Sequence, residues 1–204
     1  FTIAITSVLG SHEMAHKLAA NKHGVEATYP YFIPGPPAPI GIGTFGAVIQ
    51  QKSLAPNKNA LFDLGISGPL IGFIMAMMVT VIGIRMSQLT LVLPEGAGSL
   101  PTPLLFDLLV AAFPPNGSGN ILLPHPVAFA GWVGMVVTML NLIPVGQLDG
   151  GHIARVLLKD RARSALAVIA IVGLFFFVWP WAIIALFLVR YRDPGPLDDV
   201  SSLS

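Results

Sequence analysis

The chain has 204 residues, of which 54% are hydrophobic and only 10% are charged, and its formal net charge is +1. Soluble domains carry about a quarter charged residues, so this composition argues against an ordinary soluble protein and predicts a membrane protein. The small net charge gives no electrostatic reason to expect nucleic acid as a partner. The absence of cysteine excludes disulfides and thiolate metal sites.

The few charged residues are unevenly distributed. Three stretches contain no Asp, Glu, Lys or Arg, namely 64–84, 108–148 and 164–189. Each is long enough to cross a bilayer, because a helix needs roughly 20 apolar residues to span the hydrocarbon core. We therefore predict an all-α polytopic membrane protein, built as a bundle of about four to six transmembrane helices. A small β-hairpin or strand element and one re-entrant or interfacial helix complete the expected fold.

The first predicted helix covers about 1–21 and ends at Gly24. The Pro- and Gly-rich stretch 29–53 cannot form a helix, and its second half alternates like a short strand or hairpin. Because the chain begins at Phe1, inside an apolar segment and without an initiator methionine, we expect a truncated or processed N-terminus that further helices precede.

The second predicted helix covers about 60–84, with Asn59 as its N-cap. A long loop follows over 85–126. Within it, the sequence PTPLLFDLLVAAF at 101–113 is mostly apolar but too short to span a bilayer. We predict that this segment is the re-entrant or interfacial helix.

The last third of the chain contains three more predicted helical segments. A helix over about 127–143 is stopped by Pro144, and a short helix follows near 150–158. The apolar run 164–189 is interrupted by Pro180, and it forms either one kinked crossing or a hairpin of two short arms.

Lysine and arginine positions predict the orientation, since cytoplasmic loops carry an excess of both. One basic group follows the first helix and another follows the helix over 127–143, whereas the connection between the second and third helices holds only Arg85. Both groups are therefore expected on the same, cytosol-like side. Their members are Lys17, Lys22, Lys52 and Lys58, and Arg155, Lys159, Arg161 and Arg163.

The first helix contains the sequence HEMAH at residues 12–16. His12 and His16 lie one helical turn apart on one face, so both imidazoles can bind one ion. Neutral imidazoles hold Zn²⁺ while leaving a position for water, whose pKa the metal lowers. Glu13 projects about 100° around the helix axis from His12 and can accept the proton of that water. Because idle ionisable residues are costly at membrane depth, the motif predicts a metal site.

A catalytic zinc site needs a third protein ligand, and the sequence offers several candidates. His23 shares a helical face with the two histidines, but it lies roughly 10 Å further along the axis and could contribute only through a bend before Gly24. Glu26 would require the chain to fold back through the proline-rich loop. The metzincin spacing fails, because Ala19 and Lys22 stand where that pattern needs glycine and histidine.

Asp149 is the candidate that its surroundings favour. It directly follows the charge-free stretch 108–148, beside helix-breaking Pro144 and the glycines at 150–151, which let the backbone come close to a neighbour. The orientation argument also places it on the same side as the two histidines. Its alternative role is to cap the helix at 150–158.

The sequences HEMAH and, far downstream, NLIPVGQLDGG at 141–151 together resemble the site-2 protease family of intramembrane zinc metalloproteases. The signatures of that family are His-Glu-x-x-His and Asn-x-x-Pro-x-x-x-Leu-Asp-Gly, and every fixed position is present. The resemblance covers about residues 1–158, including GISGPL at 65–70. The extended motif, HPVAFAGWVG at 125–134 with NLIPVGQLDGGH at 141–152, is most like the plant-chloroplast, cyanobacterial and archaeal branch of the family. The connection over 85–126 is too short to hold the PDZ-like insert of some bacterial members.

This resemblance implies that His12, His16 and Asp149 bind one Zn²⁺ ion per chain and that Glu13 is the general base. It also implies that Asn141 steadies the catalytic water or the transition state. The expected function is a zinc-dependent intramembrane endopeptidase, in which water activated at the zinc by Glu13 attacks a peptide bond in or near a transmembrane segment of the substrate. The alternative is a membrane metal transporter or a non-catalytic zinc-binding membrane protein.

We expect residues 1–204 to form a single integral-membrane metalloprotease domain, with a catalytic core over about 1–158 and an apolar hairpin or kinked helix over 164–190. The expected location is a prokaryotic cytoplasmic or an organellar membrane, which the chain crosses several times. The expected partners are the lipid bilayer and a transmembrane-protein substrate. The sequence IGTFGAVIQQ at 42–51 is either a strand edge that pairs with an extended substrate or a plain structural hairpin.

Overall fold

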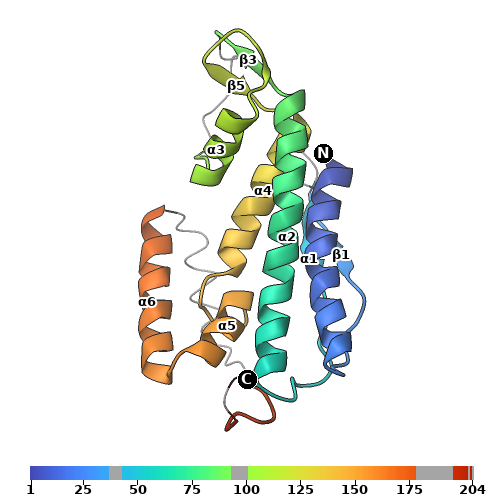
Figure 1. Ribbon diagram of the computed structural model, residues 1–204, viewed down its shortest axis with the longest axis vertical. Coiled ribbons are helices and arrows are strands. Elements are labelled where there is room, and N and C mark those ends of the chain that lie inside the picture. Colours follow the sequence, from blue (N-terminus) through green and yellow to red (C-terminus); the bar gives the residue numbers. More distant parts are fainter. Residues whose placement is uncertain (37–42, 93–100, 178–194, 202, 204) are drawn as a thin grey trace. The chain divides into compact units, whose positions relative to one another are not determined.

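The computed structural model describes residues 1–36, 43–92, 101–177, 195–201 and 203 (Figure 1). The described chain divides into two compact units, one made of Phe1–Ser11 and Ile71–Thr138, the other of His12–Leu70 and Met139–Ser204. Three helices contribute residues to both units: α1 (Thr2–Lys22), α2 (Lys58–Met86) and α4 (Pro126–Asn141).

In the first unit, small residues let the second half of α2 lie close to α4. A Cβ atom at Gly83 would overlap the Ala128 backbone, and one at Gly131 would overlap the Thr80 side chain. Thr80 is fully buried, and its hydroxyl donates to the Ala76 carbonyl at 2.7 Å. Membrane helices commonly pack through small residues and internally bonded hydroxyls of this kind.

The first unit also contains a small sheet that the sequence analysis assigned to a loop. Strands β3 (Gln88–Thr90), β4 (Asn116–Gly117) and β5 (Ile121–Leu123) pair in the order β4-β3-β5, parallel between β3 and β4 and antiparallel between β3 and β5. Strands of two or three residues are too short to show an alternating pattern. Helix α3 (Leu104–Ala112) lies within the segment predicted as a short helix.

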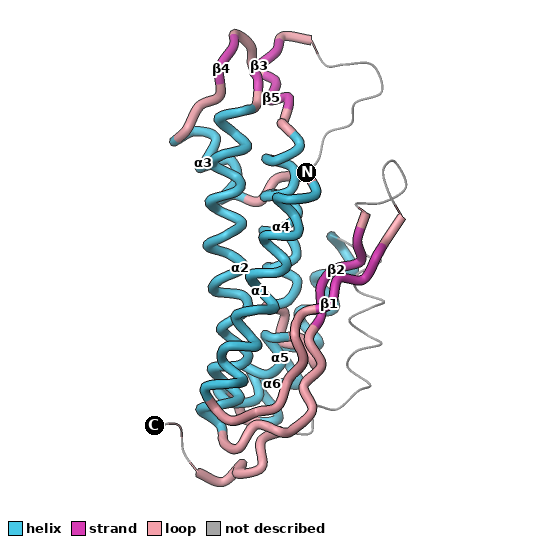
Figure 2. The backbone as a smooth tube through the Cα atoms, turned by 90° about the vertical axis from the view of Figure 1, so that its right-hand side faces the viewer, coloured by secondary structure: helices cyan, strands magenta, loops and turns pink. Residues whose placement is uncertain are grey.

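The second unit contains the predicted hairpin, with β1 (Tyr31–Pro34) antiparallel to β2 (Thr44–Val48) (Figure 2). It also contains the second half of α1, which ends as predicted before Gly24 at φ +67°. Asn57, rather than Asn59, caps α2, because its side-chain oxygen accepts the Ala60 N–H at 2.9 Å. Helices α5 (Asp149–Leu157) and α6 (Asp160–Phe177) complete this unit.

A buried apolar cluster joins the end of α1 to the start of α2 in the second unit. All of its members are at most 7% exposed, so this contact forms a well-packed part of the unit. The cluster consists of Ala20, Val25, Ala55, Ala60, Leu61 and Leu64.

The mostly helical architecture and the small hairpin agree with the prediction, whereas the number of membrane crossings stays a prediction. Within the described residues, α2 is the one helix that is both long and apolar enough to span a bilayer. The predicted crossing over 127–143 is the apolar but shorter helix α4. The run 164–189 coincides with α6 only up to Phe177, and Pro180 lies outside the described residues.

Replacing Gly83 by alanine should destabilise the first unit, because the added methyl group would overlap the backbone of α4. Overpacking typically costs about 1–3 kcal/mol, which corresponds to a fall of roughly 2–10 °C in the thermal midpoint for a chain of this size. Circular dichroism melting in detergent measures this shift.

The matched control is Gly173→Ala in α6, where an added Cβ atom would have no neighbour within 4 Å among the described residues. This variant should melt at or above the wild-type temperature, because alanine favours a helix over glycine by about 1 kcal/mol. Equal midpoints for the two variants would show that the close approach at Gly83 does not constrain stability.

Candidate metal centre

His12, His16 and Asp149 bring three metal-binding atoms to one point in the second unit. The two Nε2 atoms are 3.1 Å apart. His12 Nε2 is 3.2 Å from Asp149 Oδ2, and His16 Nε2 is 3.3 Å from Asp149 Oδ1. Ligands that bind a tetrahedral zinc ion at about 2.0–2.2 Å lie roughly 3.3 Å from one another. The three side chains therefore fit a single ion, with one tetrahedral position left over.

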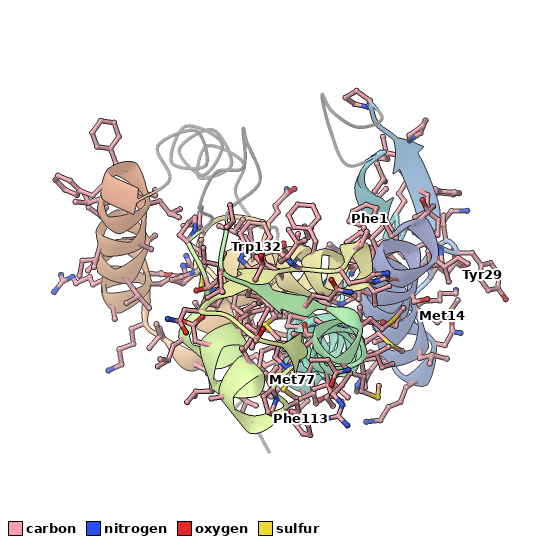
Figure 3. The ribbon with its side chains drawn as sticks, turned by 90° about the horizontal axis from the view of Figure 1, so that it is seen from above. Phe1, Met14, Tyr29, Met77, Phe113 and Trp132 are labelled. Atoms are coloured by element: carbon pink, nitrogen blue, oxygen red, sulfur yellow. The ribbon has the colours of Figure 1, made fainter. Side chains whose placement is uncertain are left out.

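The helical period of α1 places the two histidines on its buried face. His12 and His16 are 5% and 8% exposed, whereas Met14, between them in sequence, is 38% exposed and projects from the outer side of α1 (Figure 3). A spacing of four residues aligns side chains along one face of a helix, and a shift of two residues turns to the opposite face. The buried pair is thus a direct consequence of the HEMAH spacing.

The backbone of α2 fixes the orientation of the His16 ring. His16 Nδ1 lies 2.7 Å from the Leu64 carbonyl oxygen, and because a carbonyl can only accept, Nδ1 is the protonated nitrogen. Nε2 then presents its lone pair to the candidate ion, as in many histidine-ligated metal sites. One turn along α2, a Cβ atom at Gly68 would overlap the same imidazole. Glycine at this position is what lets α2 lie against the ring.

Asp149 reaches the two histidines through a tight turn after α4. Gly146 adopts φ +52°, a conformation that glycine takes without strain, and a Cβ atom at Gly150 would overlap the Leu142 carbonyl. Leu148 is the N-cap of α5 and makes no side-chain capping bond, so the alternative role of Asp149 as a cap is wrong.

Asp149 also leaves one carboxylate oxygen without a hydrogen bond. In the described part of the chain, its Oδ2 atom is buried and, although it lies 3.2 Å from His12 Nε2, it accepts no hydrogen bond. Buried acceptors are almost always satisfied by protein, water or an ion. Together with two facing imidazole nitrogens, this orphaned oxygen is the donor set that a zinc ion satisfies.

Two further polar side chains reach the same cavity. Glu13 Oε2 accepts a hydrogen bond of 3.0 Å from the backbone N–H of Ile49, the residue that follows β2. Asn141, the last residue of α4, places its Nδ2 atom 3.3 Å from His12 Nε2. Both residues and the three candidate ligands line one cavity. The sequence predicted Glu13 and Asn141 here, but it gave no sign of the Ile49 amide, since backbone donors are independent of residue type.

The cavity has a volume of about 620 Å³, which is within the usual range for ligand pockets. Its lining comes from α1, from β2 and the segment that follows it, from the start of α2, from the end of α4 and from α5 with the two residues before it. Besides the five polar residues, its lining includes Ala47, Val48, Ile49, Gln51, Leu61, Leu64, Gln147 and His152.

The rival candidate ligand His23 takes a different partner. Its Nε2 atom is 2.8 Å from Asp63 Oδ2, which also pairs with Lys22 at 3.0 Å. Among the described residues, the group of His12, His16 and Asp149 is the one that could hold a metal ion, and neither His23 nor Glu26 belongs to it. Intact helical geometry up to Lys22 keeps His23 away, as the 10 Å estimate from helical rise implied.

Residues 1–180 match the family described as Peptidase family M50. The chain therefore belongs to peptidase family M50, and the resemblance drawn from its two motifs is confirmed.

Its relatives include "Probable zinc metalloprotease EGY1, chloroplastic" of Oryza sativa subsp. japonica, which is 30% identical over 94% of this chain and 34% of its own length. The protein of the same name from Arabidopsis thaliana is 29% identical over 98% of this chain and 38% of its own length. The chain thus spans little more than a third of these relatives. Among solved structures, the site-2 protease from Methanocaldococcus jannaschii matches with a TM-score of 0.47 at 18% identity, covering 99% of this chain and 80% of that one.

Elemental analysis of detergent-purified protein tests the metal centre. We expect about one zinc per chain in the wild type, and a sharp fall in Asp149→Ala, because three protein ligands are needed to complete such a site. Asp63→Ala is the matched control, since Asp63 pairs with His23 and Lys22 outside the cluster. Full zinc occupancy in Asp149→Ala would contradict the assignment of Asp149 as a ligand.

Proposed function

We propose that this chain carries the catalytic centre of a zinc-dependent intramembrane endopeptidase, which hydrolyses a peptide bond in or near a transmembrane segment of its substrate. The convergence of His12, His16 and Asp149 at mutual distances of 3.1–3.3 Å is the observation that supports this most strongly. The names of the relatives as zinc metalloproteases point to the same metal. In this proposal the three residues hold one zinc ion, while Glu13 and Asn141 act on the reactants.

The zinc, when bound, supplies Lewis-acid chemistry that lowers the pKa of water and polarises a peptide carbonyl. Glu13 takes a proton from water as its oxygen attacks the carbonyl carbon, and returns a proton to the amide nitrogen as the C–N bond breaks. The hydrogen bond from Ile49 engages Oε2 of Glu13, so Oε1 is left to carry that proton. Asn141 donates its amide N–H to the oxygen that becomes negative in the transition state.

The substrate must be extended where it is cut, because the peptide bonds of a transmembrane helix are engaged in its own hydrogen bonds. Strand β2 pairs with β1 alone among the described strands, and its last residues, Ala47 and Val48, line the cavity. We infer that an unwound substrate segment adds to the hairpin at β2, which brings its backbone towards Glu13. Of the two roles that the sequence left open for 42–51, a strand edge for the substrate and a plain structural hairpin, this proposal takes the first.

We further propose a multi-pass protein of a prokaryotic cytoplasmic or an organellar membrane. Helix α2 supports a membrane location by its length and composition. The additional crossings rest on the charge-free stretches of the sequence, and the chloroplastic names of the relatives are in keeping with an organellar membrane.

Glu13→Gln should abolish cleavage while leaving zinc bound, because the amide keeps the shape of the side chain but cannot accept the proton. General acid–base catalysis contributes about 10²–10⁴-fold to rate, so cleavage of single-span membrane proteins reconstituted with the chain should fall by at least that factor. Mass spectrometry of the new termini measures it. The transporter alternative would be favoured instead if the wild-type protein binds zinc and moves it across liposome membranes but cleaves none of the single-span membrane proteins tested.

Ile49→Pro should slow cleavage because proline lacks the N–H that bonds Glu13. The loss of one hydrogen bond to a charged group corresponds to roughly 10–100-fold in rate. Ile49→Ala is the matched control, since it keeps the N–H while shortening the side chain. A similar loss of activity in both variants, with zinc content unchanged, would show that the Ile49 side chain matters and its amide does not.

A further inference from the structure

A second cavity in the second unit contains four cationic side chains in its lining and has no role in the proposed catalysis. Its volume is about 390 Å³. Lys58 opens α2, Arg155 lies in α5, Lys159 connects α5 to α6, and Arg163 lies in the first turn of α6. Among the described residues, the carboxylates in the lining are Asp160 and Asp199. The described part of the lining therefore carries four cations and two anions.

Three of the four cations of this cavity are more buried than the two carboxylates beside them, whereas Lys159 is exposed. The side chains of Arg155, Lys58 and Arg163 are 20%, 23% and 28% exposed. Asp160 is 89% exposed and pairs with Arg163 within the first turn of α6. Exposed ion pairs contribute little to stability, typically below about 1 kcal/mol. Because Asp160 and Asp199 are this exposed, a ligand anion can displace them at little cost.

Asp199 is the less exposed of the two carboxylates in the described lining, and it comes from the C-terminal segment 195–201. Its carboxylate is 3.3 Å from Arg155 Nη2 and 3.9 Å from Lys58 Nζ, and it is 52% exposed. Two backbone bonds hold the segment against the chain before α2, from Leu197 N–H to the Ala55 carbonyl and from Asp198 N–H to the Pro56 carbonyl. The carboxylate shows that an oxyanion can take this position between Arg155 and Lys58.

Helix α6 runs away from the end of α5, where the cationic cavity lies (Figure 1). No residue from 164 to the helix end at Phe177 is charged. Six large apolar side chains on it are at least 42% exposed in the described structure. They are Leu166, Val168, Ile169, Val172, Phe175 and Phe176. A charged cavity at the start of an exposed apolar helix has the polarity of one lipid molecule, with a headgroup at one end and acyl chains at the other.

We propose that the cavity of Lys58, Arg155, Lys159 and Arg163 binds the phosphate of an anionic phospholipid, whose acyl chains lie along α6 and whose headgroup displaces Asp199. Arginine suits this role because its planar guanidinium binds two phosphate oxygens at once, and lysine adds a point charge. A zwitterionic lipid fits less well, since its own cation would face these four. The proposal goes beyond the proposed function and does not depend on it.

Native mass spectrometry of the detergent-purified chain tests this, with dioleoylphosphatidylglycerol and dioleoylphosphatidylcholine as probes. We expect the wild type to bind the anionic lipid at least 10-fold more tightly. Arg163→Gln should weaken that binding about 5-fold, the effect of one cation close to an anionic headgroup, and Arg163→Lys should recover most of it. Arg161→Gln is the matched control, because Arg161 is on the same helix but outside the cavity lining.

The strongest test is Asp199→Asn, which removes the competing carboxylate and should tighten binding about threefold or more. If Asp199 serves only to stabilise the fold, this variant melts earlier and gains no lipid affinity, which would overturn the proposal. Equal losses of affinity for the anionic lipid in Arg163→Gln and Arg161→Gln would also overturn it, because they would show that the lipid responds to the overall positive charge of the helix start and not to the cavity. Binding of millimolar inorganic phosphate to the cavity, with no preference of the chain for the anionic over the zwitterionic lipid, would keep the phosphate chemistry but reject a lipid as its source.

Discussion

The contact between the His16 ring and the backbone of α2 constrains the whole second unit. The Leu64 carbonyl accepts a hydrogen bond of 2.7 Å from His16 Nδ1. One turn later, the missing side chain of Gly68 leaves room for the imidazole ring. Because both groups belong to a helix backbone, neither can adjust alone, and α1 and α2 must keep one spacing. The buried cluster of small and branched residues at the end of α1 maintains that spacing. The centre that includes Asp149 is therefore built on helix packing rather than on a flexible loop.

The sequence identified most of the candidate centre because its key signals are local. Four-residue spacing on a helix is enough to place His12 beside His16, and the glycines around Asp149 mark a close backbone approach. The meeting of Asp149 with these histidines could be predicted only from the family resemblance or from the charge distribution, because Asp149 lies more than 130 positions further along the chain. The Ile49 amide was invisible to sequence analysis, because every residue except proline has this donor.

The fold was predicted well in its long elements and poorly in its short ones. Hydrophobic runs located α2 and α4, and proline and glycine located the hairpin. The sheet of β3, β4 and β5 was missed because its pairing partners are only two or three residues long and depend on tertiary contacts. The cap of α2 came two residues earlier than expected, at Asn57, because several polar residues there satisfy the same preference.

Gly68 has a consequence for how related genomes are interpreted. A chain can keep His-Glu-x-x-His and the distant aspartate and still lose its centre, since any side chain at this position would occupy the space of the second imidazole. The two metal-binding motifs therefore do not by themselves guarantee the centre that this chain has. Gly68 is a third position on which it depends, and it reports on steric room where the two motifs report on chemistry.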